Sequence, residues 1–194
     1  MEIVDLFLRE HAFVHSREVA ATDFNVDWLV ADLTEEQWRA RPHGFNSIAW
    51  TFWHVTRVED GCVSLMLAGE PQLLDGDRAA LLQVDRRGHG EGMSKAEVAE
   101  LSDGIDIDAL QAYRNDVGRR TREHARALWP DRWSEAITDV DVRRAVDAGV
   151  ASDEYSIVVG KPREMLLFWW GLHHSIYHLG QAAMIRRDVT AAAV

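Results

Sequence analysis

Apolar side chains recur every three or four positions along most of the chain, and no segment alternates strictly between apolar and polar residues. The first pattern predicts helices, and the lack of the second argues against strands. Residues 2–33 carry the apolar stripe without a break, so we predict one long amphipathic helix there. A second helix is predicted to begin at Asn46 or Ser47, both good N-caps, and to end near Gly69.

Capping signals mark the next elements. Thr34 is followed by acidic residues and then by Pro42, which predicts a short helical turn between the first two long helices. The run "SKAE", residues 94–97, has the pattern of a capping box and opens a helix. That helix is predicted to pause near Gly104 and to resume over residues 106–128.

The last long helix is predicted from Pro162, which the first turn of a helix tolerates, to about Arg187. The glycine-rich residues 69–92 predict a long loop between the second and third long helices. Residues 129–160 give mixed signals, including a possible short helix, so we predict an irregular segment before the fourth long helix. Together these elements predict an all-α fold, a four-helix bundle that forms a single domain over residues 1–194.

Composition and charge narrow the classes of function. The formal net charge of −11 opposes nucleic-acid binding, which depends on positive charge on the protein. No apolar run reaches the ~20 residues that a membrane span requires. The single cysteine, Cys62, excludes an intramolecular disulfide, and the acidic first residues are unlike a secretory signal. We therefore expect a soluble cytoplasmic protein.

The segment "GLHHSIYHLGQ", residues 171–181, places three histidines in the most apolar part of the chain. His174 and His178 are four residues apart, so on a helix they share one face, with their Cβ atoms ~5–6 Å apart. Two imidazoles at that separation can bind one divalent ion. His173 is rotated by about 100° from that face and is a weaker candidate.

Two other histidine positions are weighed against this pair. His11 and His15 have the same spacing but lie among charged residues, so we predict a half-solvated pair there. His54 lies in the middle of a predicted helix, among aromatic and aliphatic neighbours, and is the best candidate for a third ligand. A lone histidine on an apolar face is, however, more often a hydrogen-bonded core residue than a ligand.

These motifs resemble those of one known family. The run "LTEEQWRARPHGFNSIAWTFWHVTRVED", then a long loop, then H-x3-H directly before "LGQ" on a late helix, is similar to the DinB/YfiT-like superfamily of metal-binding helical bundles. The resemblance implies that His54, His174 and His178 bind a divalent metal ion. The chain departs from many relatives at Leu179, where they carry a histidine or a basic residue.

A site of three neutral imidazoles leaves the charge of the ion uncompensated and at least one coordination position open. Such an ion can lower the pKa of bound water to ~7 or hold a thiol as its thiolate. The resemblance implies a metal-dependent S-transferase or related enzyme, which uses a low-molecular-weight thiol such as mycothiol or bacillithiol and a small electrophilic substrate. Zinc, nickel and iron are not distinguished by this donor set.

A non-catalytic function is the alternative. The last predicted helix is apolar on nearly every side, and Gly171 and Gly180 suggest close backbone approach along it. These features are typical of a metal- or ligand-binding bundle that forms a homodimer through this helix. A homodimer is compatible with the enzyme as well.

Four further residues are candidates for the surroundings of the ion. Arg57 could hold an anionic group of the substrate, or pair with a nearby acid on its own helix. Gln181 could donate to a ligand, orient an imidazole or bond between helices. Tyr177 is predicted to lie off the ligand face and to pack in the interior, and Trp50 to lie in the core or at the mouth of a pocket.

Overall fold

The central helix begins and ends where its capping residues predict. The Ser47 hydroxyl accepts a hydrogen bond from the backbone N–H of Trp50 and caps α4 (Ile48–Val58). The helix continues directly into a π-helical segment, η3 (Glu59–Ala68). It stops at Gly69, whose φ of 77° lies in the left-handed region that favours glycine.

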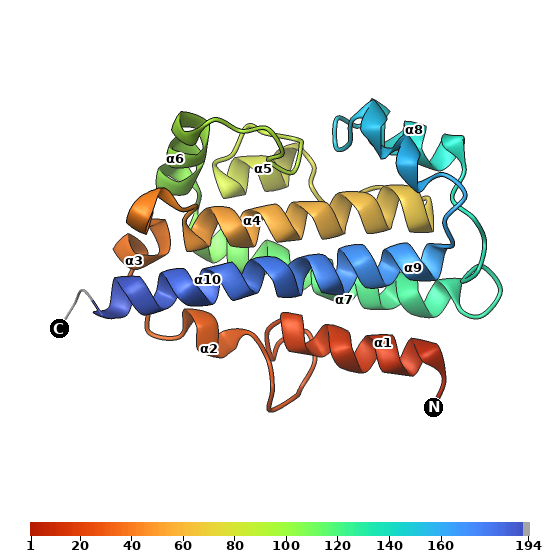
Figure 1. The fold of residues 1–194 in the computed structure, drawn as a ribbon, viewed down its shortest axis with the longest axis horizontal. Coiled ribbons are helices and arrows are strands. Elements are labelled where there is room, and N and C mark those ends of the chain that lie inside the picture. Colours follow the sequence, from red (N-terminus) through yellow and green to blue (C-terminus); the bar gives the residue numbers. More distant parts are fainter. Residues whose placement is uncertain (192–194) are drawn as a thin grey trace.

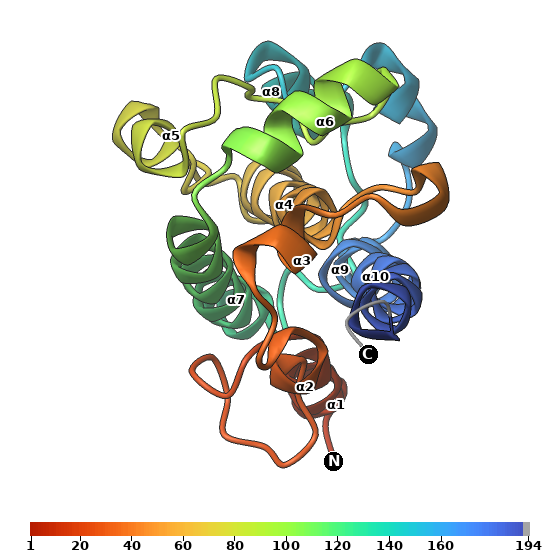
Figure 2. The same cartoon turned by 90° about the vertical axis from the view of Figure 1, so that its left-hand side faces the viewer.

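Three more long helices run along α4. They are α1 (Ile3–His11), α7 (Ile107–Leu128) and the continuous helix formed by α9 (Arg163–Phe168), η5 (Trp169–His173) and α10 (His174–Ala191). Figure 1 shows them lengthwise, and Figure 2 shows α4 in the middle of the bundle, in contact with α7 and α10. The computed structural model describes residues 1–191, and the predicted all-α bundle is confirmed.

The other elements connect these helices. On the side away from α1, α6 packs on α4, α8 on η3 and α5 on α7 (Figure 1). Capping boxes begin three of the short helices, at Thr34, Ser94 and Thr138. None of the helices within residues 1–191 combines the length and the apolar character needed to cross a membrane. In chain order the short elements are η1 (Ala12–Val14), α2 (Asp27–Val30), α3 (Glu35–Arg39), η2 (Pro42–Gly44), α5 (Gly76–Leu82), α6 (Lys95–Gly104), α8 (Asp139–Asp147) and η4 (Asp153–Val158).

The prediction of one helix over residues 2–33 is wrong. α1 ends at His11, and after η1 the backbone turns to an extended conformation at His15, with φ −118° and ψ 172°. Polar side chains then bond the backbone in place of a helical ladder. The N–H of Asp27, for example, donates to the Asn25 side chain at 2.9 Å. The apolar residues of this segment therefore lie on separate short elements joined by a turn, and not on one helix.

Two predicted connections contain helices. The glycine-rich segment 69–92 holds α5, which begins where the Asp75 side chain accepts a hydrogen bond from the N–H of Arg78. Its first position is occupied by Gly76, a poor helix former, so the pattern does not reveal it. The irregular segment 129–160 holds α8 and η4.

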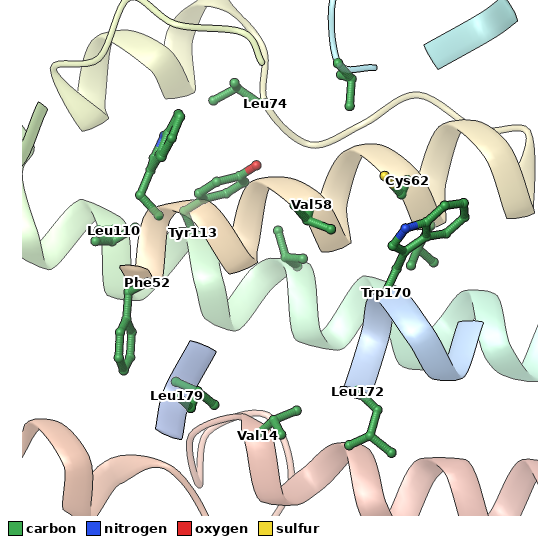
Figure 3. Packing of buried hydrophobic residues seen from close by; sticks show 14 of the residues in the cluster. Val14, Phe52, Val58, Cys62, Leu74, Leu110, Tyr113, Trp170, Leu172 and Leu179 are labelled. Carbon is green, nitrogen blue, oxygen red and sulfur yellow. The ribbon is translucent and has the colours of Figure 1, made fainter. Parts of the chain in front are cut away.

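The core is built around α4, all of whose residues are buried. Figure 3 shows Phe52 and Val58 of α4 among the apolar side chains of α7, with Leu110 and Tyr113 labelled. Ionisable side chains of α4 and η3 are buried with them. These are His54, Arg57, Glu59 and Asp60. Each one needs an internal partner, because an unpaired buried charge is costly.

Glu59 is partnered by the two histidines near the N-terminus. Its Oε1 lies 2.9 Å from Nε2 of His11, and its Oε2 lies 3.0 Å from Nε2 of His15. The two rings stack with centroids 4.4 Å apart, and none of the three side chains is more than 1 % exposed. We call this group the His11–Glu59–His15 clamp, because it ties the N-terminal segment to η3. The predicted half-solvated state of the histidine pair is therefore wrong.

The clamp forms because the charged neighbours of the two histidines, on α1 and in the turn after His15, point away from the buried face. Phe7 and His11 share the buried face of α1, and Gly118 of α7 makes room for His15. A Cβ at Gly118 would lie 2.5 Å from Nδ1 of that ring. Burial lowers the pKa of His15 to about 4. Burial by itself would raise the pKa of Glu59, but the two histidines outweigh it and hold that pKa well below its ordinary range.

We expect the clamp to make the protein sensitive to acid. Because the pKa of His15 falls from 6.5 in the unfolded chain to about 4 in the folded one, the unfolded chain binds more protons between these values. The free energy of unfolding should therefore decrease as the pH falls through this window, by on the order of 3 kcal/mol from this residue.

The variant His15→Gln keeps an N–H donor for Glu59 but cannot titrate. It should be less stable than the wild type at pH 7, yet its urea midpoint should change less between pH 6.5 and pH 4.5. Other histidines with lowered pKa values are present in both proteins, so the difference in slope isolates His15. Parallel stability curves for the two proteins would contradict this prediction.

Candidate metal centre

The structure brings together three histidines that are far apart in the sequence. His54 of α4 faces His174 and His178 of α10, with ring centroids 5.0 Å and 4.7 Å from its own. The rings of His174 and His178 are 4.6 Å apart. One potential ligand atom from each residue lies within 4.8 Å of the other two. We call these residues the histidine triad, a donor set that suits a divalent ion.

The π-helical segment η5 directly precedes the two ligands of the last helix. A π turn holds an extra residue, so it changes which side chains of the following helix face α4. Beyond η5, His174 and His178 turn toward His54, while His173 is exposed. Single π turns inside longer helices are frequent at functional sites, and here the turn sets the phase of the histidine pair.

His54 is held in place from two sides. Its Nδ1 lies 2.5 Å from the backbone oxygen of His89, which can only accept, so Nδ1 carries the proton and Nε2 is left for a ligand. Trp50 stacks on the imidazole with an interplanar angle of 9° and centroids 4.8 Å apart. The indole N–H of Trp50 in turn donates to the sulfur of Met93 at 3.3 Å.

The two histidines of α10 differ in their hydrogen bonds. Nδ1 of His178 lies 2.8 Å from Oε1 of Gln181, so Nε2 of this ring is also left for a ligand. Gln181 thus has the position expected of a residue that orients an imidazole. Nδ1 of His174 is buried and has no hydrogen-bond partner within residues 1–191. An unpaired buried nitrogen is costly, and a bound ligand is one way to offset that cost.

Burial keeps the three rings neutral at pH 7. It lowers the pKa of His54 to about 4, although the hydrogen bond to the His89 carbonyl raises it. It lowers the pKa of His174 to about 3, helped by the two other rings. The pKa of His178 is also lowered by burial, against the bond to Gln181. A neutral imidazole offers the lone pair that a metal ion needs, so the triad can bind an ion without first losing a proton.

The loop that supplies the His89 carbonyl is fastened to α4. We call residues 84–93 the strap. Arg57 donates to the backbone oxygen of Arg87 in the strap at 2.5 Å and to Asp60 at 3.0 Å. Its guanidinium is fully buried and makes two further bonds inside the protein. Arg57 therefore does not hold a substrate group, as one interpretation predicted, but pairs with an acid on its own helix and supports the strap.

Gly90 brings the strap into contact with the tryptophans of α4. Its φ of 96° favours glycine, and a Cβ there would lie 2.7 Å from Trp53 and 3.1 Å from Trp50. A larger residue would push the strap away from α4. The close approach at Gly90 therefore helps to hold the neighbouring His89 carbonyl beside His54.

Two residues near the triad are not predicted from the sequence. The His89 side chain is 5 % exposed, and its Nε2 lies 3.0 Å from the hydroxyl of Tyr155 in η4. The ring of Tyr155 stacks on Trp170 of η5. η4 thus closes over the strap from outside. His89 lies between two loop glycines, so no helical periodicity marks it, and a lone histidine in that setting is the only signal.

The outer side of α10 is uncovered. Tyr177 is 66 % exposed and lies edge-on to His178, so the predicted interior packing of this residue is wrong. Gly171 makes a close approach inside the domain, since a Cβ there would lie 3.2 Å from Phe7. A Cβ at Gly180, by contrast, would meet no atom of the described chain within 4 Å.

The His11–Glu59–His15 clamp also places three potential metal ligands within 4.8 Å of one another. Its hydrogen bonds argue against an ion there. Both Nε2 atoms point to Glu59, and both Nδ1 atoms are buried without a partner in residues 1–191. Histidines that bind a metal almost always donate their other N–H to an acceptor. In the triad, the Nδ1 atoms of His54 and His178 have such acceptors and that of His174 has none, whereas neither histidine of the clamp has one.

Charge points to the same conclusion. Arg114 is buried and interacts with Glu59, and burial lowers the pKa of its guanidinium to about 10. The carboxylate of Glu59 already balances this guanidinium. A divalent ion would add two positive charges to a site that excludes water, at a large cost in desolvation. We assign the clamp a structural role and take the triad as the candidate metal centre.

Fold and geometry together define a class of protein, the all-α bundles that hold three histidines between an inner helix and the last helix. A model of the DinB superfamily matches residues 21–182, and the chain belongs to this superfamily. The match includes the whole triad and begins after His11 and His15, so the histidines of the clamp lie outside it. A comparison with curated proteins finds no match.

The strap gives a prediction with a matched control. Gly90→Ala should lower the free energy of unfolding by about 3 kcal/mol, because it combines a positive φ with a clash against Trp53. Gly92→Ala also has a positive φ but meets no atom within 4 Å, and should cost only about 1 kcal/mol. Urea unfolding of both variants measures the difference. Equal losses would show that the strap does not depend on close packing at Gly90.

Proposed function

We propose that the chain binds one divalent metal ion at the histidine triad. Four observations support this: the three ring nitrogens converge, the rings are neutral at pH 7, and His54 and His178 each donate Nδ1–H to an internal acceptor. The fourth is membership of the DinB superfamily. The single observation that carries most weight is the pair of Nδ1 bonds, because they leave both Nε2 atoms for a common ligand.

We further propose that the protein is an S-transferase or related enzyme that uses a low-molecular-weight thiol. When bound, a divalent ion at three neutral imidazoles supplies positive charge that favours a thiolate or hydroxide over its protonated form. In the reaction the thiol gives up its proton to solvent water, and its sulfur forms a bond to the electrophilic atom of the substrate. The leaving group departs with the electrons of the bond that breaks.

The thiol must come from outside the chain. Cys62 is fully buried, and burial raises the pKa of its thiol to about 12, so it is neither accessible nor ionised at pH 7. A cosubstrate is therefore required, and the cytoplasm, which we propose as the compartment, keeps such thiols reduced. The role of the protein is to hold the three ligand nitrogens in place and to exclude water with Trp50 and the strap. Gln181 in addition orients the imidazole of His178.

Metal content tests the triad directly. Protein expressed without an affinity tag should carry about one divalent ion per chain, and His54→Ala and His178→Ala should each reduce this below about a tenth. Gln181→Ala should keep the ion but weaken its binding about tenfold, because it removes only the acceptor for Nδ1. Elemental analysis and chelator competition measure these quantities.

His173→Ala and His15→Gln are the matched controls. His173 is the exposed neighbour of a triad residue, and His15 belongs to the clamp, so both variants should retain the full metal content. Retention of the ion in both His54→Ala and His178→Ala would rule out the triad. Loss of the ion in His15→Gln alone would show that the ion binds at the clamp and not at the triad.

The alternative is a non-catalytic metal-binding bundle that forms a homodimer. It is favoured by large apolar side chains that α9, η5 and α10 leave exposed, which are typical of an interface. They are Met165, Trp169, Ile176, Tyr177 and Met184. The two functions differ in turnover and not in metal content.

Consumption of thiol distinguishes them. The metal-loaded wild type should consume small thiols in the presence of alkylating electrophiles, and His54→Ala should fall to the uncatalysed rate. Loss of free thiol, followed with a chromogenic disulfide, measures both. A protein that holds its ion but consumes no thiol over a broad panel of thiols and electrophiles would be a binding module.

A further inference from the structure

A cavity of about 370 Å³ shares Gln181, the hydrogen-bond partner of His178, with the surroundings of the triad. Its walls are the turn Gly44–Asn46, Thr51 on the first half of α4, and Gln181, Met184 and Ile185 on α10. This volume is in the range of sites for small organic molecules. Three separate segments of the chain form it, so its shape depends on the packing of η2 against the two helices.

Two residues connect the cavity to the triad. Gln181 lines the cavity with its side chain and also accepts the hydrogen bond of His178 Nδ1 at 2.8 Å. Thr51 precedes His54 by three residues and so lies about one turn away on the same face of α4. One helical turn is about 5.4 Å, so Thr51 and Gln181 each place the cavity within about one turn of a triad residue along its helix.

The lining of the cavity carries no charged side chain. Ile185 forms a buried apolar wall, and Phe45 and Met184, each 54 % exposed, form an apolar lip. The cavity at α5, by contrast, is lined by Asp75, Asp85, Arg86 and Arg87 among others. A charged group placed beside Phe45, Met184 and Ile185 would lose hydration without an ion pair from the lining itself. The ammonium of Lys95 lies outside the lining, 3.8 Å from the position of a Cβ at Gly44. The lining therefore suits an uncharged occupant.

The polar atoms of the cavity select for neutral hydrogen-bonding groups. Because Oε1 of Gln181 is engaged with His178, the amide nitrogen of Gln181 remains to donate. The Thr51 hydroxyl already donates to the backbone oxygen of Ser47 at 2.8 Å, so it is left as an acceptor. An amide or a hydroxyl on an apolar body meets both requirements, because each of these groups can donate as well as accept.

We propose that this cavity binds the uncharged organic body of the molecule whose thiol reaches the triad. The proposal rests on the proposed function, since it takes the triad as the place where the thiol binds. Met184 and Ile185, which supply the apolar wall and part of the lip, are the specificity-determining residues. They lie just beyond the segment that matches the DinB superfamily, so this wall belongs to the part of α10 outside the match.

Cobalt-loaded protein and three probe thiols test the proposal. The probes are 2-mercaptoethanol, which is too small to fill the cavity, 2-phenylethanethiol, which has an apolar body, and the same molecule with a para carboxylate. Thiolate-to-cobalt absorption reports the binding of each. In the wild type, 2-phenylethanethiol should bind roughly tenfold more tightly than 2-mercaptoethanol, and the carboxylate should remove that advantage.

Variants of the wall and the lip locate the occupant. Met184→Ala should weaken the binding of 2-phenylethanethiol roughly threefold to tenfold and leave the affinity for 2-mercaptoethanol unchanged. Ile185→Phe fills the cavity, so it should weaken the binding of 2-phenylethanethiol further and again leave that of 2-mercaptoethanol unchanged. Ile176→Ala is the control, because Ile176 is 53 % exposed on the same helix but does not line the cavity. Met184 is exposed, so its variant should fold even where Ile185→Phe does not.

The possible results separate the two proposals. If both neutral thiols bind and Met184→Ala affects neither, the cavity is not the binding site, although the metal centre stands. Tighter binding of the carboxylate probe than of 2-phenylethanethiol would overturn the proposal that the occupant is uncharged. If cobalt binds but no thiol perturbs its spectrum, the thiol function fails and the cavity proposal fails with it.

Discussion

The burial of ionisable side chains on the central helix is the constraint on which the rest of the structure depends. α4 and nearly all of η3 have no exposed face, so His54, Arg57, Glu59 and Asp60 cannot reach water. A buried polar group without a partner costs about 1–3 kcal/mol, and a charge costs more. Segments that are distant in the sequence therefore return to this helix and supply a partner to each residue. Glu59 is met by the N-terminal histidines, and Asp60 by the backbone N–H groups of Leu73 and Leu74.

The same constraint positions the candidate metal centre. The strap must return to α4 because Arg57 needs acceptors, and one of these is the backbone oxygen of Arg87. Two residues further on, the His89 carbonyl accepts from His54 and so orients the ring toward α10. The orientation of His54 is thus a consequence of pairing a buried guanidinium, and it requires no dedicated element. Gly90 and the contact of His89 with Tyr155 then keep the strap in place.

The sequence predicts those parts of the structure that depend on helical periodicity. The helix from Ser47 to Gly69 and the H-x3-H pair follow from spacing and caps alone, because residues four apart share a face in any helix. The triad needs His54 in addition, and the role of His54 as a third ligand is implied by the resemblance to a family. The residues that orient the ligands divide in the same way. Gln181 lies three residues from His178 and was a candidate, whereas His89 reaches His54 through an irregular loop and was not.

Two of the errors have the same physical cause, which is that helix faces cannot be read from neighbours in the sequence. His11 and His15 are flanked by charged residues and were predicted to be half-solvated, yet those neighbours point elsewhere and the pair is buried against Glu59. Tyr177 shows the converse, since it has apolar neighbours and is exposed. Both depend on whether another layer covers that side of the helix, which is decided by long-range packing.

The two histidine clusters show why spacing is insufficient to assign chemistry. Both come from histidines four apart, and both converge with a third group on the central helix or its π-helical continuation. In the clamp the third group is a carboxylate, so the imidazoles donate to it and its two oxygens are paired without an ion. In the triad the third group is another neutral imidazole, and three lone pairs can be satisfied together only by a cation or a hydrogen-bond donor. The identity of the third residue, and not the pair, therefore decides which cluster is the candidate metal centre.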